Sequence, residues 1–480
     1  MTAPKQFASY VDANAESYIQ RLAKAVAIPS VSGDAKYRQH VFDMADFLVN
    51  EMRSLGINVH KVDLGKHVLD GEELQLPPAI LGSIGNDPKK KTILLYAHYD
   101  VQPALLSDGW DHEPFRLTPD PKTGRLYGRG ASDDKGPLLG WLNVVEAHVK
   151  SNIELPVNLK FCFEGMEESG SDGLDDLIKA ESPKGKFFDG VHAVCISDNY
   201  WLNDRTPCLT YGLRGISYYK VSVSGPARDL HSGVFGNTVH EPMTDLIHLL
   251  GKLVTPTGEI KIPGLANLVA PLTEEERKRY EVIDYSVADV EHSAGARVAI
   301  SDDKVRVLTG RMREPSLSIH GIEGAFSAPG AKTSVAKTTS KGKFSIRLVP
   351  DMTPELVDPI VINYLEGEFA KLNSKNKLKI ENLHGGKPWV TDPGHWNYKA
   401  AIKATETIYK KTPDLTREGG SIPVTLTFAE ALGVNVLLLP MGRGDDGAHS
   451  TNEKLDRSNY IEGTKLLGTY LHEVGAISIV

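Results

Sequence analysis

Short apolar runs recur along the chain, and each run stops abruptly in a cluster of polar residues. The clearest runs cover residues 92–97, 157–163, 193–197 and 434–439. Five to seven apolar residues bounded in this way are typical of a buried strand in a mostly parallel sheet. Between the runs, apolar side chains recur with a helical period, for example from Leu138 to Val149 and near the C-terminus. Strands that alternate with helices predict an α/β fold with helices on both faces of the sheet.

A different pattern begins near Leu213. Strand-like alternation and helical periods follow one another over residues 219–223, 243–250, 344–348, 353 onward and 378–380. This order approaches β-α-β-β-α-β, which is typical of a small two-layer domain. We therefore expect residues 213–384 to form an inserted domain, and residues 1–212 and 385–480 to form the two parts of a larger one. An acidic, helix-like stretch at 274–289 interrupts the insertion and indicates no function by itself.

The composition of the chain mainly excludes classes of protein. The chain has 480 residues, of which 41% are hydrophobic and 24% charged, so it is an ordinary globular protein too long for one core. Its 54 basic and 62 acidic residues form no basic stripe, and we expect neither a nucleic acid nor a membrane as a partner. No membrane-spanning run or signal-peptide pattern is evident. Three cysteines without a C-x-x-C spacing fit a cytoplasmic protein.

Histidines and carboxylates gather where the predicted strands end. The carboxyl ends of parallel strands lie at one edge of a sheet, so these side chains should face one crevice although they are far apart in sequence. So many carboxylates resist burial together unless cations bind them, and this number of ligands suits a pair of divalent ions. Histidine and carboxylate ligands suit zinc and manganese almost equally. The set comprises His98, Asp100, Asp133, Glu167, Glu168, Asp198 and His449.

Each of these residues has a simpler interpretation when it is taken alone. A single histidine at a strand end is most often a hydrogen-bonded structural residue, and Asp133 and Asp134 could equally be helix caps. Residues 442–447 fit G-x-G-x-x-G, but no helix pattern opens from them and two aspartates would oppose a pyrophosphate. Residues 419–423 do not match the G-x-S-x-G motif of serine hydrolases. The combination of residues therefore indicates a hydrolytic metal site.

The candidate residues lie in five short motifs: 98–103 (HYDVQP), 128–136 (GRGASDDKG), 165–171 (GMEESGS), 197–200 (SDNY) and 445–449 (DDGAH). Together these motifs resemble the co-catalytic metallopeptidase family of carnosinase and cytosolic non-specific dipeptidase. The likeness spans nearly the whole chain, including residues 230–233 (LHSG) and 417–423 (REGGSIP). Within the family, the chain is most similar to cytosolic dipeptidases, among them the fungal enzymes that split Cys-Gly during glutathione breakdown.

The resemblance implies a role for each matching residue at the metal site. Asp133 would bridge two divalent ions. Glu167 would be the general base, and Asp100 would hold the imidazole of His98. Each ion would be completed by one histidine and one carboxylate: His98 with Asp198, and His449 with Glu168.

The resemblance also implies that the inserted domain is a lid that forms a homodimer. His231 on this lid would reach the active site of the partner subunit and stabilise the oxyanion. Arg347 would bind the terminal carboxylate of the substrate, although its place opposite the apolar residues of its strand, taken alone, favours a solvated face. The other residues implied to line the substrate pocket are Thr333, His384, Gly420 and Ser421.

The resulting hypothesis is a metal-dependent dipeptidase that hydrolyses free dipeptides such as Cys-Gly. A water held by two ions, zinc or alternatively manganese, would give its proton to Glu167 and attack the peptide carbonyl, and Glu167 would return the proton to the leaving amine. One rival is an N-acyl amino-acid deacylase or a carboxypeptidase on the same scaffold. Another is a metal-binding scaffold without catalytic activity.

Overall fold

The computed structural model describes residues 3–69, 71–324, 326, 329–335, 339–420 and 422–478. Its largest element is a nine-stranded sheet. The four middle strands run parallel, and antiparallel pairs occur on both sides of them. The predicted mostly parallel sheet is therefore confirmed. The strands are, in spatial order, β1 (Asn58–Val62), β4 (Ala79–Ile84), β8 (Asn158–Glu164), β5 (Thr92–His98), β9 (Ala193–Ile196), β19 (Asn435–Leu438), β10 (Cys208–Leu213) and β17 (Trp389–Val390), with β18 (Asp414–Glu418) also paired to β10.

Helices cover both faces of this sheet, as the alternation of strands and helices predicted. Along β5, Ile93 and Leu95 point to one apolar core, and Leu94 and Tyr96 point to the other, because successive strand side chains face opposite ways. One face carries α1 (Lys5–Ala13), α2 (Ala15–Val26), α3 (Arg38–Ser54), α4 (Lys135–Lys150), α12 (Trp396–Tyr409) and α14 (Arg457–Gly475), and the other carries α5 (Leu174–Glu181) and α13 (Pro423–Leu432).

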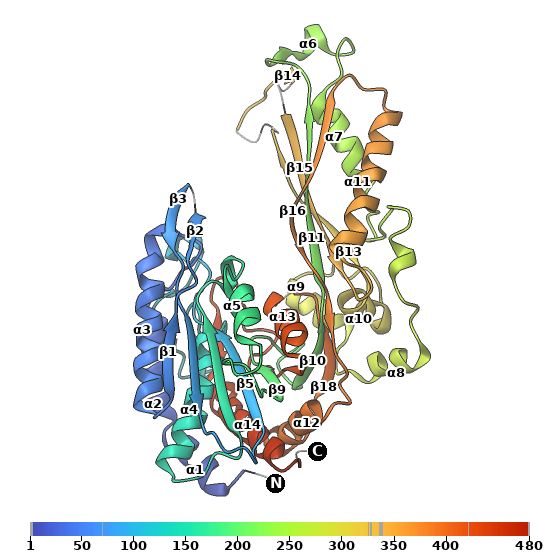
Figure 1. Ribbon diagram of the computed structural model, residues 1–480. Helices are drawn as coiled ribbons and strands as arrows, with labels where there is room; N and C mark the ends of the chain where they lie inside the picture. The colour runs from blue at the N-terminus through green and yellow to red at the C-terminus, as the bar shows by residue number, and fades with distance from the viewer. Residues whose placement is uncertain are drawn as a thin grey trace.

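A second, four-stranded antiparallel sheet extends away from the first, as Figure 1 shows. Two helices pack against one of its faces and form a separate apolar core. The chain order is β-α-β-β-α-β, which confirms the two-layer architecture. Its elements are β11 (Gly215–Ser224), α7 (Pro242–Leu250), β13 (Ser316–Glu323), β15 (Thr339–Leu348), α11 (Pro354–Lys371) and β16 (Lys377–Gly386), in the spatial strand order β13-β15-β11-β16.

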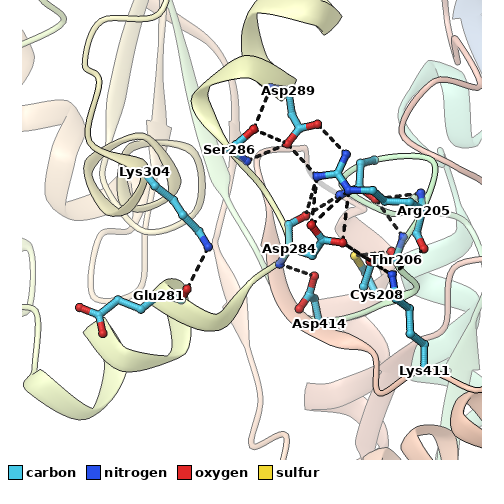
Figure 2. Close-up of polar contacts among 11 residues, drawn as sticks. Arg205, Thr206, Cys208, Glu281, Asp284, Ser286, Asp289, Lys304, Lys411 and Asp414 are labelled. Atoms are coloured by element: carbon cyan, nitrogen blue, oxygen red, sulfur yellow. Dashed lines mark hydrogen bonds and ion pairs between the residues drawn. The ribbon is translucent and has the colours of Figure 1, made fainter.

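The acidic stretch at 274–289 forms α8 (Glu274–Val282) and the start of α9 (Val287–Ala294), which dock beside the first sheet. Together with α10 (Lys304–Met312), these helices share a small apolar core with Trp201 and Cys208. Polar contacts surround this core (Figure 2). The guanidinium of Arg205 lies 3.1 Å from Asp284 and 2.7 Å from Asp289. Ion pairs therefore hold the acidic stretch against Arg205, which precedes the second sheet in the sequence.

Smaller elements complete the fold. At the far end of the second sheet, β12 (Leu230–His231) pairs with β14 (Ser334–Val335) beside α6 (Ser232–Phe235) (Figure 1). None of the helices in the described ranges is both long and apolar enough to cross a membrane. The remaining elements are β2 (Lys66–Leu69), β3 (Glu72–Gln75), β6 (Thr118–Pro119), β7 (Arg125–Tyr127), β20 (Lys454–Asp456) and the short helices η1 (Ala35–Tyr37), η2 (Leu106–Asp108), η3 (Glu167–Ser169) and η4 (Ala266–Leu268).

Candidate metal centre and active site

The four middle strands of the first sheet bring most of the candidate residues to one edge. His98 is the last residue of β5, and it lies opposite Glu164, the last residue of β8. The chain then turns into η3, which begins with Glu167. Asp198 follows the end of β9 by two residues. Because these strands are parallel neighbours, their carboxyl ends coincide, and side chains from distant parts of the sequence meet there.

Asp133 lies at the centre of the cluster, just before α4. One of its carboxylate oxygens, Oδ1, lies 3.1 Å from Nε2 of His98. The other, Oδ2, lies 3.1 Å from Nε2 of His449, which is also 3.0 Å from Oε2 of Glu168. Oδ1 of Asp198 lies 3.6 Å from Nε2 of His98. The two oxygens of Asp133 thus face two separate groups, each made of one imidazole and one further carboxylate.

The charges of this cluster favour a bound cation. Hydrogen bonds with Asp133 and Glu168 raise the pKa of His449 to about 11. Burial would lower the pKa of His98, but the nearby carboxylates, led by Asp198, raise it well above its ordinary value. Burial raises the pKa of Asp198 to about 6. The carboxylates therefore require positive charge at this place, which protonated imidazoles or divalent ions can supply.

The donor set also fits divalent metal ions. His98, Asp133 and Glu168 offer ligand atoms that all lie within 4.8 Å of one another, and so do His98, Asp134 and Asp198. Nitrogen and oxygen donors without thiolates are typical of open, hydrolytic sites. Asp134 was not among the residues predicted from the sequence to bind metal. Oδ2 of Asp134 accepts a hydrogen bond from the backbone N–H of His98, and its buried Oδ1 has no hydrogen-bond partner among the described residues.

Asp100 connects two parts of the site. Nδ1 of His98 lies 3.0 Å from the backbone oxygen of Asp100 and 3.4 Å from its carboxylate. The same carboxylate accepts hydrogen bonds of 3.1 Å from the backbone N–H groups of Glu167 and Glu168. Asp100 is fully buried, so water does not compete for these contacts. This residue therefore fixes both the imidazole of His98 and the turn that carries the two glutamates.

Glu453 holds Asp133 in place, and the sequence analysis did not identify it. Its buried carboxylate accepts hydrogen bonds of 3.0 Å from the backbone N–H groups of Gly130, Ser132 and Asp133, and it pairs with Arg129 at 2.8 Å. Burial raises the pKa of Glu453 to about 7, and the charge of Arg129 opposes this shift. The residue stands in a polar stretch of sequence, and no local pattern distinguishes it from a solvent-exposed turn.

A third acidic cluster lies close in sequence to His449 but already has its own cation. Asp445, Asp446 and Asp456 have carboxylate oxygens within 4.8 Å of one another. Nζ of Lys454 lies between them, 2.8 Å from Asp445 and 2.7 Å from Asp446. Arg125 also pairs with Asp445, and Arg443 pairs with Asp456. Because three cations face the three carboxylates, we assign the cluster no metal. The G-x-G-x-x-G stretch that contains two of these aspartates forms turns and opens no helix.

A cavity of about 200 Å³ opens beside the cluster. Gly420 lines it, as the resemblance implied, whereas Ser421 lies outside the described residues. Glu418 and Tyr200 also line it, and the sequence analysis gave neither of them a role. The full lining consists of Asp133, Glu167, Asp198, Asn199, Tyr200, Leu213, Glu418, Gly420, Ile422, Ala448 and His449.

The other residues implied to bind substrate lie on the second sheet and its extension. His384 lines a neighbouring cavity of about 180 Å³, which shares Leu213 and Ile422 with the first. Arg347 is a half-buried residue of β15, and burial lowers its pKa. His231 and Thr333 are exposed at the β12–β14 pair, far from β5 and β9 in Figure 1. Within one chain, the structure therefore leaves His231 and Thr333 apart from the cluster.

Known proteins resemble this chain over most of its length. The sequence model of the peptidase family M20/M25/M40 matches residues 94–473. The chain is 54% identical over 468 residues to the Cys-Gly metallodipeptidase dug1 of Schizosaccharomyces pombe, covering 98% of each chain.

Solved structures give the same result. The structure of the dipeptidase Dug1p of Saccharomyces cerevisiae matches with a TM-score of 0.91 and 51% identity, covering 99% of this chain and 100% of that one. Human carnosine dipeptidase 1 matches with a TM-score of 0.90 and 42% identity, again covering 99% of this chain and 100% of that one. The chain therefore belongs to the peptidase family M20/M25/M40 and is an enzyme that hydrolyses peptide bonds.

Proposed function

We propose that this peptidase is a metal-dependent dipeptidase that cleaves free dipeptides, with Cys-Gly as a substrate, and that it acts in the cytoplasm in glutathione breakdown. The observation that carries the proposal is the arrangement at Asp133, whose two oxygens face two separate ligand groups 3.1 Å away on either side. The names of the fungal relatives at 52–55% identity support Cys-Gly as the substrate.

In this proposal, the chain would hold two divalent ions, zinc or alternatively manganese, and Asp133 would be a ligand of both. When bound, the ions polarise the peptide carbonyl and lower the pKa of a water molecule toward neutrality. The remaining ligands are His98 and Asp198 for one ion and Glu168 and His449 for the other.

Glu167 is the general base of the proposed reaction. It lines the cavity next to the metal ligands, and its backbone N–H is held by Asp100. Burial raises the pKa of Glu167 well above its ordinary value, and the neighbouring carboxylates add to this shift against the effect of His98. A carboxylate with a raised pKa can accept a proton from the attacking water and then release it to the leaving amine.

The substrate pocket requires residues from the second sheet. We propose that residues 213–384 form an inserted lid and that Arg347 binds the terminal carboxylate of the dipeptide. Thr333, His384, Gly420 and Ser421 line the pocket, and Thr333, which lies beside His231, does so in the partner subunit. We further propose that the enzyme is a homodimer in which His231 serves the partner subunit's site. The exposed position of His231 at the far end of the extension supports this arrangement, because it leaves the residue free to reach a second copy.

The experiment compares Cys-Gly with N-acetyl-Cys-Gly before and after metal removal, followed by addition of zinc or manganese. Metal-dependent release of glycine from the free dipeptide alone is the expected result. Cleavage of only the acetylated compound would replace the proposal with a deacylase. Metal binding without cleavage of either compound would contradict the assignment of Cys-Gly as the substrate.

A further inference from the structure

Glu418 places an additional carboxylate in the wall of the active-site cavity. It is the last residue of β18, which pairs in parallel with β10 so that Glu418 lies opposite Leu213. The cavity that Glu418 lines is the one lined by Asp133, Glu167 and Asp198. The apolar side chains of Leu213 and Ile422 line the same cavity. Substrate bound beside the metal ligands therefore shares its cavity with this carboxylate.

The Glu418 carboxylate has no polar partner in the part of the chain that the structure describes. Burial raises its pKa, and the charges of Arg311 and Arg214 oppose this shift. Both guanidinium groups bind elsewhere: Arg311 donates to the hydroxyl of Tyr285 at 2.8 Å, and Arg214 donates to the backbone oxygen of Glu314 at 3.1 Å. The carboxylate is half-buried and makes no hydrogen bond to the described protein, so it is open to a charged donor that enters the cavity.

Contacts at both ends of β18 hold this strand in place, so the fold fixes the position from which the Glu418 carboxylate projects. At the start of β18, Asp414 accepts a hydrogen bond of 2.9 Å from the backbone N–H of Asp284 (Figure 2). Next to Glu418, the guanidinium of Arg417 lies 3.4 Å from Glu276 of α8 and stacks over the ring of Tyr211. The helices of the acidic stretch therefore hold β18 at both of its ends.

We infer that Glu418 binds the free α-ammonium group of the substrate's first residue and so makes the enzyme prefer unblocked peptides. The inference rests on the proposed dipeptidase function, which places the scissile carbonyl at Asp133 and Glu167. In a dipeptide, the α-ammonium is separated from this carbonyl by a single carbon atom, so it enters the same cavity. An ammonium group supplies the hydrogen-bond donors that this carboxylate lacks and a positive charge that pairs with it directly.

Other carboxylates of the cavity are less suited to this role. Asp198 already faces His98 at 3.6 Å. Asp133 faces both imidazoles, and Glu167 must remain available to the attacking water. Glu418 is the cavity-lining carboxylate to which the proposed reaction assigns no task.

The test uses two substrates that differ only in the α-ammonium, Ala-Gly and propionyl-glycine, with the metal-loaded full-length enzyme. For Glu418→Gln, we expect kcat/KM on Ala-Gly to fall roughly 10- to 100-fold. The competitive inhibition constant of propionyl-glycine should change by less than about 3-fold. Glu430→Gln is the matched control, because it makes the same chemical change at an exposed position of α13 that does not line the cavity. This control should leave both values near those of the unmodified enzyme.

The outcomes separate this inference from the proposed function. If Glu418→Gln weakened inhibition by propionyl-glycine as much as it lowered kcat/KM on Ala-Gly, only the role of Glu418 would be overturned. An unchanged kcat/KM on Ala-Gly would have the same consequence. An unmodified enzyme that binds metal but cleaves neither Ala-Gly nor Cys-Gly would instead overturn the proposed function. If Glu418→Gln does not fold, Glu418→Asp replaces it and should give the same selective loss on Ala-Gly, since the shorter side chain retracts the charge.

Discussion

The edge of the first sheet and the far end of the second sheet differ in how completely one chain forms them. At the edge, Asp133 contacts two histidines, and Asp100 and Glu453 hold the backbone around the cluster through buried hydrogen bonds. At the far end, His231 is exposed and belongs to a two-residue strand pair. The metal-binding part of the site is thus organised before substrate arrives, whereas the remote histidine needs a motion or a second copy to act.

The largest effect should come from the proposed base. Replacing Glu167 with Ala leaves the side chains of the five proposed metal ligands in place, so both ions should stay bound while kcat on Cys-Gly falls by about 10⁴-fold, the upper range for a general base. Turnover is measured by glycine release and metal content by elemental analysis. A variant that kept near-normal turnover would remove Glu167 from the mechanism.

The second prediction concerns His231. A residue that stabilises the oxyanion typically contributes about 10²- to 10³-fold to kcat, so His231→Ala should lose activity on this scale although it lies far from the cluster in one chain. Exposed His240, which lies in the same extension, supplies the control variant His240→Ala. Steady-state kinetics on Cys-Gly measure both variants.

Mixing the two inactive variants tests whether His231 acts across a dimer. Subunits of Glu167→Ala and His231→Ala, once exchanged, create one site with an intact glutamate and an intact histidine from the partner. Activity should therefore reappear on mixing. If subunits exchange and no activity returns, His231 acts within its own chain or plays no part.

The third prediction concerns the support of Asp133. Glu453→Gln removes the charge from the carboxylate that accepts three backbone hydrogen bonds around Asp133 and pairs with Arg129. Groups that orient metal ligands typically affect affinity by about 10- to 100-fold, so the metal dissociation constants should rise on this scale. Metal titration by calorimetry measures the change. Exposed Glu430 provides a control of the same chemistry in Glu430→Gln, which should bind metal normally.

Sequence patterns predicted the first sheet and most of the side chains that cluster at its edge because the physical causes are local. A buried strand gives a run such as Thr92 to Ala97, and the next polar residue, His98, must lie at the sheet edge. Glu453 and Glu418 could not be found in this way because each depends on neighbours more than 100 positions away. Nothing in their own segments marks Glu453 as buried or Glu418 as lining a cavity. Similarly, the helical character of Glu274 to Val282 could be predicted from the sequence. The residues against which α8 packs could not be predicted.

The smallest effect should appear where the acidic stretch docks on the first sheet. Arg205 pairs with Asp284 and Asp289 near the surface (Figure 2), so Arg205→Gln should lower the free energy of unfolding by only about 0.5–1 kcal/mol. Hydrogen bonds from Thr206 and Arg205 lower the pKa of Asp284, and those from Arg205 and Ser286 lower the pKa of Asp289. A carboxyl group with a lowered folded-state pKa stabilises the fold above its ordinary pKa of about 4, and this contribution is lost as the pH falls through the lowered value. The difference between the two proteins in urea unfolding should therefore be full at pH 7 and shrink below pH 4. A difference that stayed constant down to the onset of acid unfolding would show that Arg205 stabilises the fold by packing rather than by its ion pairs.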